Sequence, residues 1–211
     1  TGILKWNTYV IPEVPVATGT KNAAGVDRYG PSGAPVWNSP AIDIARGLLY
    51  VGTGEAYTSP ASSSSDAVIA MRLDDGQIVW RKQLLAGDAW NMACFIGGGA
   101  NCPEENGPDL DIGASIILWQ SERQSRLFVG QKSGDVYALD PDHQGAVRWH
   151  RKLGRGGFAG GVHWGMTFDG TTLFVPIADT DFLGLASGEA FPGVHALDPD
   201  TGLTRWYTRA D

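Results

Sequence analysis

Short runs of apolar and β-branched residues recur along the chain, separated by turns rich in Gly, Asp and Pro. The runs RLFVGQ at 126–131 and DVYALD at 135–140 either alternate apolar and polar positions or are almost wholly apolar. A period of two is typical of a β-strand, and a short apolar run is typical of a strand buried on both faces. Few stretches show the 3.6-residue period of an amphipathic helix. The pattern therefore predicts an all-β protein.

The strand-like runs form repeating units that end in tryptophan. Three endings are complete: AMRLDDGQIVW (70–80), ALDPDHQGAVRW (138–149) and ALDPDTGLTRW (196–206). The chain opens on TGILKW, which matches the end of a further unit. Each complete unit holds four short runs, and repeated groups of four antiparallel strands are typical of a β-propeller. A β-sandwich with two similar halves fits three near-equal units less well.

The repeat also predicts how the chain is divided. We expect one domain over 1–211, a partial β-propeller of about three four-stranded blades. The blade units fall at about 37–83, 113–153 and 162–209, and residues 1–36 form the end of a preceding blade and a connector. Propellers close with four to eight blades, so three units do not complete a ring. We therefore expect the chain to be a segment of a longer protein.

The shared ending has its own mechanics. In the last copy, Asp198 follows Ala196 by two residues, and Trp206 follows Gly202 by four. The Pro-Asp-x-Gly sequence favours a tight turn, because Gly adopts positive φ without strain. Tryptophan offers a large flat ring and an N–H that needs an acceptor. The motif therefore predicts a contact that joins adjacent blades, with a structural role.

Composition and charge narrow the classes of partner. The 211 residues include 29 Gly and 8 Trp, only 18% are charged, and the net charge is −7. This balance argues against nucleic acid or an anionic membrane as the partner. No run of eighteen apolar residues is present, so we expect no transmembrane segment. Thr1 does not begin a signal peptide, which says little if the start has been removed.

The two cysteines lie in one glycine-rich stretch. Cys94 and Cys102 bound the sequence CFIGGGANC. A disulfide between them predicts an oxidising compartment such as the periplasm, and the alternative is a pair of free thiols. Zinc is not favoured, because no His or third Cys lies nearby. Two other stretches predict ordinary loops: SSSS at 62–65, a flexible loop tip, and GRGGFA at 154–159, which lacks the helix that a dinucleotide site requires.

Taken together, these segments resemble a known family. The A-x-D-x-x-x-G-x-x-x-W ending is similar to the tryptophan-docking motif of quinoprotein alcohol dehydrogenases, eight-bladed propellers that bind pyrroloquinoline quinone (PQQ) and calcium. GAPVWNSPAIDIARGLLYVGTGE at 33–55, DAWN at 88–91 and VGQKSGDVYALD at 129–140 resemble three site segments of that family. YVIPE at 9–13 and the NCPEENGPD loop are most similar to the branch that acts on polyvinyl alcohol. The resemblance implies that this chain forms about three of the eight blades of such a propeller.

The resemblance assigns three residues to the cofactors. Trp37 matches the tryptophan whose ring forms the floor under the quinone; otherwise it packs at the start of a strand. Lys132 matches the basic residue that stabilises charge on the quinone oxygens; otherwise it is a solvated lysine in a turn. Glu55 stands where the family usually has a calcium-binding Asn. A carboxylate is also a suitable hard ligand, although it adds a negative charge.

The base that accepts the alcohol proton is less clearly placed. Asp88 matches the first Asp of the family's Asp-x-Trp-Asp, with Asn91 in the fourth position. A long insertion follows, so a different alignment gives the role to Glu104 or Glu105. Two further acids in the same stretch are less favoured, Asp109 and Asp111.

A further pair matches a cofactor segment. His163 and Trp164 stand where the family has Gly-Gly-x-Asn-Trp, and His either replaces the hydrogen bond of that Asn or belongs to an ordinary inner strand.

The resemblance implies a periplasmic enzyme that oxidises alcohols by hydride transfer to PQQ, with Ca²⁺ as the metal. Polyvinyl alcohol or other secondary alcohols are the expected substrates, and cytochrome c is the expected electron acceptor. No C-x-x-C-H haem motif is present in the sequence. Two alternatives remain: a non-catalytic periplasmic propeller that binds proteins, because an outer-membrane assembly propeller shares the docking motif, and a quinoprotein that acts on sugars.

Overall fold

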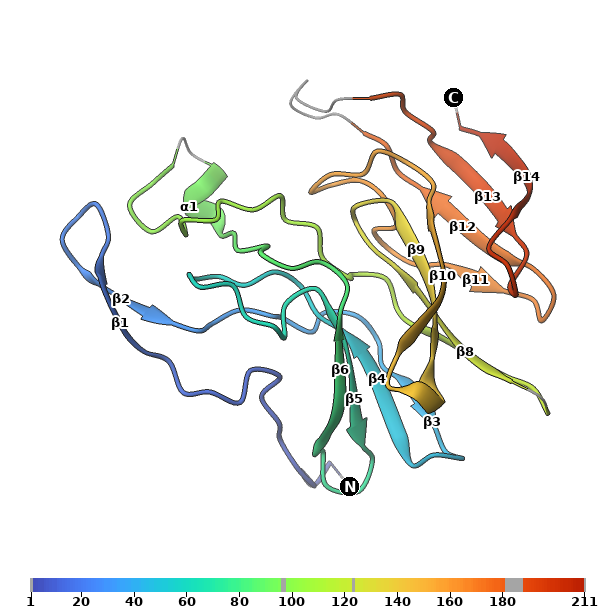
Figure 1. The fold of residues 1–211 in the computed structure, drawn as a ribbon, viewed down its shortest axis with the longest axis horizontal. Helices are drawn as coiled ribbons and strands as arrows, with labels where there is room; N and C mark the ends of the chain where they lie inside the picture. Colours follow the sequence, from blue (N-terminus) through green and yellow to red (C-terminus); the bar gives the residue numbers. More distant parts are fainter. Residues whose placement is uncertain (1, 96–97, 123, 181–187, 211) are drawn as a thin grey trace.

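Three four-stranded antiparallel sheets follow one another along the chain (Figure 1). The computed structural model describes residues 2–95, 98–122, 124–180 and 188–210. In each sheet the strands pair in chain order. The first sheet contains β3 (Ala41–Asp43), β4 (Leu48–Gly52), β5 (Ala67–Arg72) and β6 (Ile78–Gln83). The second contains β7 (Ile117–Gln120), β8 (Ser125–Gly130), β9 (Asp135–Asp140) and β10 (Ala146–Lys152). The third contains β11 (Thr167–Phe168), β12 (Leu173–Ile177), β13 (Gly193–Leu197) and β14 (Thr204–Arg209).

The other elements lie outside the three sheets. A two-stranded hairpin, β1 (Val16–Lys21) and β2 (Asp27–Gly30), precedes the first sheet and stands away from it at the left of Figure 1. A single helical turn, α1 (Met92–Phe95), lies between the first and second sheets, and a 3₁₀ turn, η1 (Pro141–His143), joins β9 to β10. The prediction of an all-β fold, a partial β-propeller with tryptophan-docking motifs, is confirmed.

The repeated tryptophans and glycines join adjacent sheets. A Cβ atom built on Gly76 would lie only 2.4 Å from the ring of Trp6, so the ring rests directly on the glycine backbone. The same relationship recurs in the next two joints, at 2.9 Å for Gly145 and Trp80 and 2.6 Å for Gly202 and Trp149. Each tryptophan therefore packs against the turn of the following unit.

Hydrogen bonds reinforce these joints. The indole N–H of Trp6 donates to the carbonyl of Leu73 at 3.0 Å, and that of Trp149 donates to the carbonyl of Pro199 at 2.8 Å. Within each sheet the tryptophan faces a buried alanine across the last strand pair, next to a register shift: Ala70–Trp80, Ala138–Trp149 and Ala196–Trp206. The predicted interblade role of the motif is confirmed, and the small alanine leaves room for the ring.

The hydrophobic core lies between the sheets. One cluster joins Tyr50 and Val68 of the first sheet to Leu127 and Leu139 of the second. Another joins the second sheet to the third, from Phe128 across to Leu173, Val175 and Leu197. Face-to-face packing of neighbouring sheets is the arrangement expected of propeller blades.

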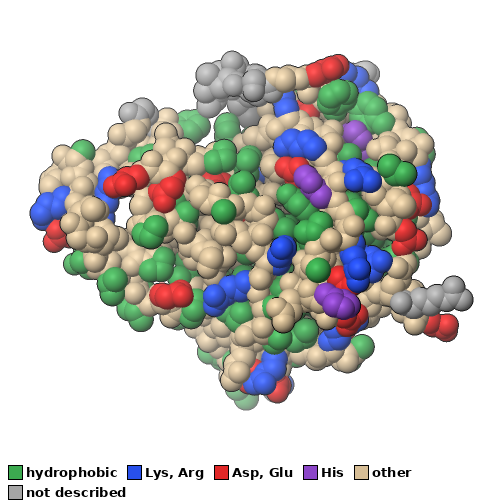
Figure 2. All heavy atoms as spheres, in the orientation of Figure 1, with side chains coloured by type: hydrophobic (Ala, Val, Ile, Leu, Met, Phe, Trp, Pro, Cys, Tyr) green, Lys and Arg blue, Asp and Glu red, His purple; other side chains and the backbone are tan. Residues whose placement is uncertain are grey.

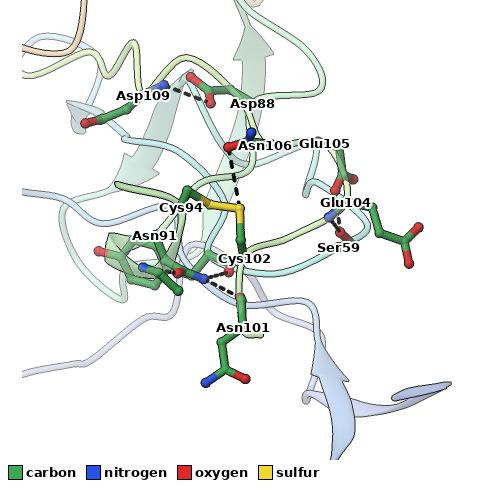
Figure 3. The surroundings of a disulfide bond; sticks show 12 residues. Ser59, Asp88, Asn91, Cys94, Asn101, Cys102, Glu104, Glu105, Asn106 and Asp109 are labelled. Carbon is green, nitrogen blue, oxygen red and sulfur yellow. Dashed lines mark hydrogen bonds between the residues drawn. A yellow bond between two sulfur atoms is a disulfide. The ribbon is translucent and has the colours of Figure 1, made fainter. Parts of the chain in front are cut away.

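The loop between the first and second sheets carries the disulfide. Cys94 and Cys102 are bonded, as predicted, and Figure 3 shows this bond at the centre of the loop. The prediction of a flexible loop tip at 62–65 is wrong in one respect, because Ser64 and Ser65 are buried. The amide of Gln83 donates to the carbonyls of Ser62 and Ser65 at 3.0 Å and holds this stretch against β6.

Charged and hydrophobic side chains share the surface. Acidic and basic side chains are interspersed on the face shown in Figure 2, with hydrophobic side chains between them. Among the described residues, no helix has the length and apolar character needed to cross a membrane.

Candidate active site

The second strands of the first two sheets end next to each other in space. Glu55 follows β4 by three residues and Lys132 follows β8 by two. The segment around Asp111 connects them, because the amide of Glu55 donates to Oδ1 of Asp111 at 2.9 Å and the amide of Lys132 donates to the Asp111 carbonyl at 3.0 Å. Three segments far apart in the sequence therefore meet at one end of the sheets.

Lys132 lies between two aspartates. Its ammonium is 2.8 Å from Oδ1 of Asp109 and 2.7 Å from Oδ2 of Asp111, and all three side chains are buried. Burial alone would lower the pKa of Lys132, but the charges of Asp111 and Asp109 raise it above its usual value. A buried charge requires such partners. Lys132 is therefore a charged group fixed by the site, and the solvated-lysine alternative does not apply.

Glu55 adds a third carboxylate. Burial, and after it the hydrogen bond to Asp111 and the charges of Asp111 and Asp109, raises the pKa of Glu55 to about 9. Burial opposes ionisation of Asp111 too, but its hydrogen bond from Glu55 and the ammonium of Lys132 hold its pKa below the usual value. Oε2 of Glu55 is buried and has no hydrogen-bond partner. An unsatisfied buried oxygen of this kind is costly and is the position that a cation would satisfy.

The residues fit a hard metal ion. Ligand oxygens of Glu55, Asp109 and Asp111 lie within 4.8 Å of one another, and all three residues are buried. Calcium prefers carboxylate and carbonyl oxygens, several of them from one compact site. Without a metal, Glu55 keeps its proton near neutral pH, and a bound cation would take the place of that proton beside Asp109 and Asp111.

Asp88 contacts the backbone of the segment that carries Asp109 and Asp111. Its Oδ1 accepts the amide of Asp109 at 3.2 Å and its Oδ2 accepts the amide of Leu110 at 2.8 Å, while the side chain is only 1% exposed. Burial raises the pKa of Asp88 above its usual value, although these two hydrogen bonds act to lower it. A Cβ atom on Gly107 would lie 2.3 Å from Oδ1 of Asp88, so glycine is needed there. The carboxylate thus fixes the backbone that presents Asp109.

Asp109 itself has an unusual backbone. Its φ is +56°, in the left-handed region that Asp and Asn adopt more readily than other residues with a side chain. Burial raises the pKa of Asp109 to about 6, with the ion pair to Lys132 opposing the rise. A carboxyl with a pKa near 6 is well placed to accept a proton near neutral pH.

Aromatic side chains adjoin the charged cluster. The ring of Trp37, 39% exposed, rests on Gly113, and the Lys132 ammonium lies 5.6 Å from its centroid. His163 and Trp164 meet this ring edge-on, with centroids at 5.9 and 6.3 Å. Nδ1 of His163 is buried without a partner, and burial, followed by the charge of Lys132, lowers the pKa of this imidazole. The structure therefore brings all four predicted cofactor residues together.

The alternative bases lie elsewhere. Glu104 pairs with Arg28 at 3.1 Å, and Figure 3 shows its carboxylate directed away from Asp88. Glu105 accepts hydrogen bonds from Ser59 and from the amide of Ala61. Despite its partial burial, these bonds hold the pKa of Glu105 below its usual value. Both glutamates therefore serve contacts between loops.

The sequence favoured Asp88 over Asp109 and Asp111, and the structure places Asp109 and Asp111 next to Lys132. Their position in the repeat could have indicated this, because they lie a few residues before the first strand of the second sheet. Trp37 stands in the same relation to β3, and Trp164 to β11. Nothing in the sequence distinguished Asp66 from an ordinary loop residue. It is nevertheless fully buried, and neither of its carboxylate oxygens has a hydrogen-bond partner.

Two family models match the chain. Residues 1–94 match the β-propeller domain of glucose, ethanol and alcohol dehydrogenases that is named for PQQ, and residues 132–211 match the outer membrane protein assembly factor BamB. Among curated proteins, the chain is 39% identical to a polyvinylalcohol dehydrogenase of Sphingopyxis sp. (strain 113P3) over 209 residues, which cover 98% of this chain and 32% of the relative. A polyvinylalcohol dehydrogenase of Pseudomonas sp. is also 39% identical, over 97% of this chain and 31% of the relative.

Solved structures agree on the fold. The quinohemoprotein alcohol dehydrogenase of Comamonas testosteroni superposes with a TM-score of 0.59 at 16% identity, over 85% of this chain and 35% of that protein. BamB from Moraxella catarrhalis gives 0.50 at 14% identity, over 88% of this chain and 43% of that protein. The chain spans about a third of the length of the curated relatives that it matches. The sequence matches, together with the propeller fold, show that this chain is similar to the β-propeller domain of the PQQ-dependent alcohol dehydrogenases.

Proposed function

We propose that the whole protein oxidises alcohols with PQQ and Ca²⁺, with polyvinyl alcohol or other secondary alcohols as substrates and cytochrome c as electron acceptor. The observation that carries this proposal is the buried Lys132, held between Asp109 and Asp111 and next to the exposed face of Trp37. The 39% identity to two polyvinylalcohol dehydrogenases supports the substrate class. The disulfide supports a periplasmic location.

Each cofactor has residues suited to it. Glu55 and Asp111 would hold the metal ion through their clustered oxygens, with the Asp109 carboxylate beside them and free to accept a proton. Trp37 would carry the planar quinone on its ring, with His163 and Trp164 along the ring edge. When bound, PQQ supplies a two-electron acceptor for the hydride of the alcohol, and Ca²⁺ supplies a Lewis acid.

The protein's own groups divide the remaining work. We assign the alcohol proton to Asp109, because its carboxyl has a pKa of about 6 and lies in the charged cluster. Lys132 provides a fixed positive charge opposite developing negative charge. Asp88, the base predicted from sequence, is supported better as a positioning residue, since both of its oxygens accept backbone N–H groups.

The test uses the full-length protein loaded with PQQ and Ca²⁺ and follows dye reduction with secondary alcohols, polymeric alcohols and sugars. We expect Asp109→Asn to lower kcat at least 100-fold, as expected for loss of a general base. Asp88→Asn is expected to cost less and to weaken thermal stability. Full turnover in Asp109→Asn with none in Asp88→Asn would return the base to Asp88. A wild-type protein that neither binds PQQ nor oxidises any of these substrates would overturn the proposal.

Metal binding has a matched pair of variants. Glu55→Gln removes a charge from the proposed metal ligands while keeping the size of the side chain, and we expect about 10-fold weaker Ca²⁺ binding by calorimetry. Glu105→Gln changes the same functional group outside the cluster and is expected to bind Ca²⁺ as the wild type does. Equal affinities in both variants would remove Glu55 from the metal site.

A second candidate function is a non-catalytic propeller that binds proteins in the periplasm. The match of residues 132–211 to the assembly-factor model favours it. A scaffold has no need for three buried carboxylates around one lysine, an arrangement that is costly without a ligand. PQQ binding by the full-length protein separates the two functions, because a scaffold would bind none.

A further inference from the structure

A cavity of about 270 Å³ lies between the β1–β2 hairpin and the disulfide loop. The two walls are tied to each other, since Nδ2 of Asn22 lies 2.5 Å from Oδ1 of Asn101 and Arg28 pairs with Glu104 at 3.1 Å. Cys102 lines the cavity, so the disulfide holds that wall in place. The cavity is slightly smaller than common small-molecule sites, which span about 300–1,000 Å³. It therefore suits a short extended segment of a ligand.

The cavity and the charged cluster share one wall. Residues 55–57 and 88–91 run side by side, joined by a bridge between Ala56 and Ala89. Glu55 and Asp88 lie at the cluster end of these segments, while Tyr57 and Asn91 line the cavity. At about 3.5 Å per residue, Tyr57 is at most ~7 Å along the chain from Glu55. Burial, together with the charges of Glu55, Asp111 and Asp109, raises the pKa of Tyr57, in agreement with this closeness.

The lining favours a neutral ligand that carries hydroxyl groups. Its two charged residues are both neutralised, Asp27 by Lys21 at 2.5 Å and Arg28 by Glu104. Tyr29 and Tyr57 are 56% and 40% exposed, and within the described residues neither phenol has a hydrogen-bond partner. A tyrosine offers a flat apolar face and a hydroxyl that both donates and accepts. Two of them in one cavity match a carbon chain with hydroxyls along it.

We propose that this cavity is a subsite for a neutral polyhydroxylated chain, and that it holds the stretch next to the hydroxyl oxidised at the Lys132 cluster. The subsite deepens, and rests on, the proposed alcohol oxidation. Contact with the neighbouring stretch would favour a polymer over a small alcohol, because only the polymer reaches both sites. Tyr29 is the most informative residue for a test, since it belongs to the hairpin and not to the segments that carry the charged cluster.

The test compares Tyr29→Ala in the full-length enzyme with Tyr9→Ala, which removes another exposed tyrosine, one outside this cavity. The measured quantity is kcat/KM for an oligomer of vinyl alcohol divided by kcat/KM for propan-2-ol. We expect this ratio to fall about 10-fold in Tyr29→Ala through a higher KM for the oligomer, and to stay at the wild-type value in Tyr9→Ala. Tyr29→Phe is expected to fall between the two, because it keeps the ring.

A binding measurement separates this inference from the proposed function. Calorimetry with the oligomer and the full-length protein without PQQ is expected to give a Kd about 10-fold higher for Tyr29→Ala than for the wild type. Unchanged Kd and unchanged ratio in Tyr29→Ala would overturn the subsite even where alcohols are oxidised. If the wild type oxidises no alcohol, the proposed function fails, and Tyr29-dependent oligomer binding alone would still support a binding site here.

Discussion

The ammonium of Lys132 lies 2.8 Å from Oδ1 of Asp109, although the two residues are separated by 22 others that include the whole first strand of the second sheet. Both side chains are buried, so each charge depends on the other for its stability. This pair links the geometry of the fold to the proposed chemistry, because a change at either residue alters both.

Replacing Lys132 with Met should destabilise the protein strongly. The substitution leaves Asp109 and Asp111 buried without their counter-charge, and breaking a buried ion pair of this kind costs about 3–5 kcal/mol. Thermal unfolding of the Ca²⁺-free protein measures the loss. Lys152→Met is the control, because Lys152 pairs with Asp135 at a half-exposed position, where ion pairs contribute about 0–1 kcal/mol. Similar losses in both variants would contradict a buried pair.

Asp66 should make stability depend on pH. Burial raises its pKa from 3.8 to about 9, followed in size by the charges of Asp88 and Asp111. Because the folded state holds this proton more tightly than the unfolded state, the contribution to stability is full below pH 3.8 and is lost as pH rises towards 9. The slope reaches at most ~1.4 kcal/mol per pH unit.

The Asp66→Asn variant tests this dependence, since asparagine does not titrate and tolerates the φ of +48° at this position. We expect its unfolding midpoint to vary less than that of the wild type between pH 5 and 9. Asp74→Asn, at an exposed position, should follow the wild-type curve. A variant curve parallel to the wild type would show that Asp66 ionises normally.

The docking contact can be tested with two glycines of similar backbone conformation. Gly202 has φ +69° and lies against Trp149, whereas Gly47 has φ +66° and no atom within 4 Å of an added Cβ. Alanine strains the backbone equally at both positions. The additional contact with the ring should make Gly202→Ala less stable than Gly47→Ala by about 1–3 kcal/mol. Thermal unfolding of both variants gives the difference, and equal midpoints would mean that the ring moves away without cost.

Removing the disulfide should loosen one loop without changing the blades. For a separation of 8 residues, the chain-entropy model gives about 2.5 kcal/mol. In the double variant Cys94→Ser and Cys102→Ser, we expect faster amide hydrogen exchange over residues 91–95 and 98–106 and unchanged exchange in β4 and β8. Slow exchange throughout the loop would show that hydrogen bonds such as that from Asn91 to Tyr57 suffice to hold it.

The sequence carried enough information for the fold and for part of the site. The blades follow from apolar runs of period two and from tryptophans at repeated places, because both are local patterns. Trp37, Lys132, His163 and Trp164 were grouped through a family resemblance, and the structure brings them into contact. Their roles with the cofactor stay predictions.

The acids could not be ranked in the same way. The disulfide loop separates Asp88 from Asp109, and spacing alone does not say which of them faces Lys132 after the chain returns. The structure places both nearby, with the carboxylate of one holding the backbone of the other. Asp66 follows four serines, a composition typical of an exposed loop, but contacts with Gln83 fold that stretch inward. Both outcomes depend on contacts between distant segments.

The tryptophan-on-glycine joint points one way, from each unit to the unit that follows it. Because the same two residue types make each of these joints, a blade offers its glycine turn to the blade before it and its tryptophan ring to the blade after it. Gene duplication or loss of a whole unit would then leave all joints matched. Blade number can change in evolution without redesign of an interface, while the loops that carry Glu55, Asp111 and Lys132 diverge independently.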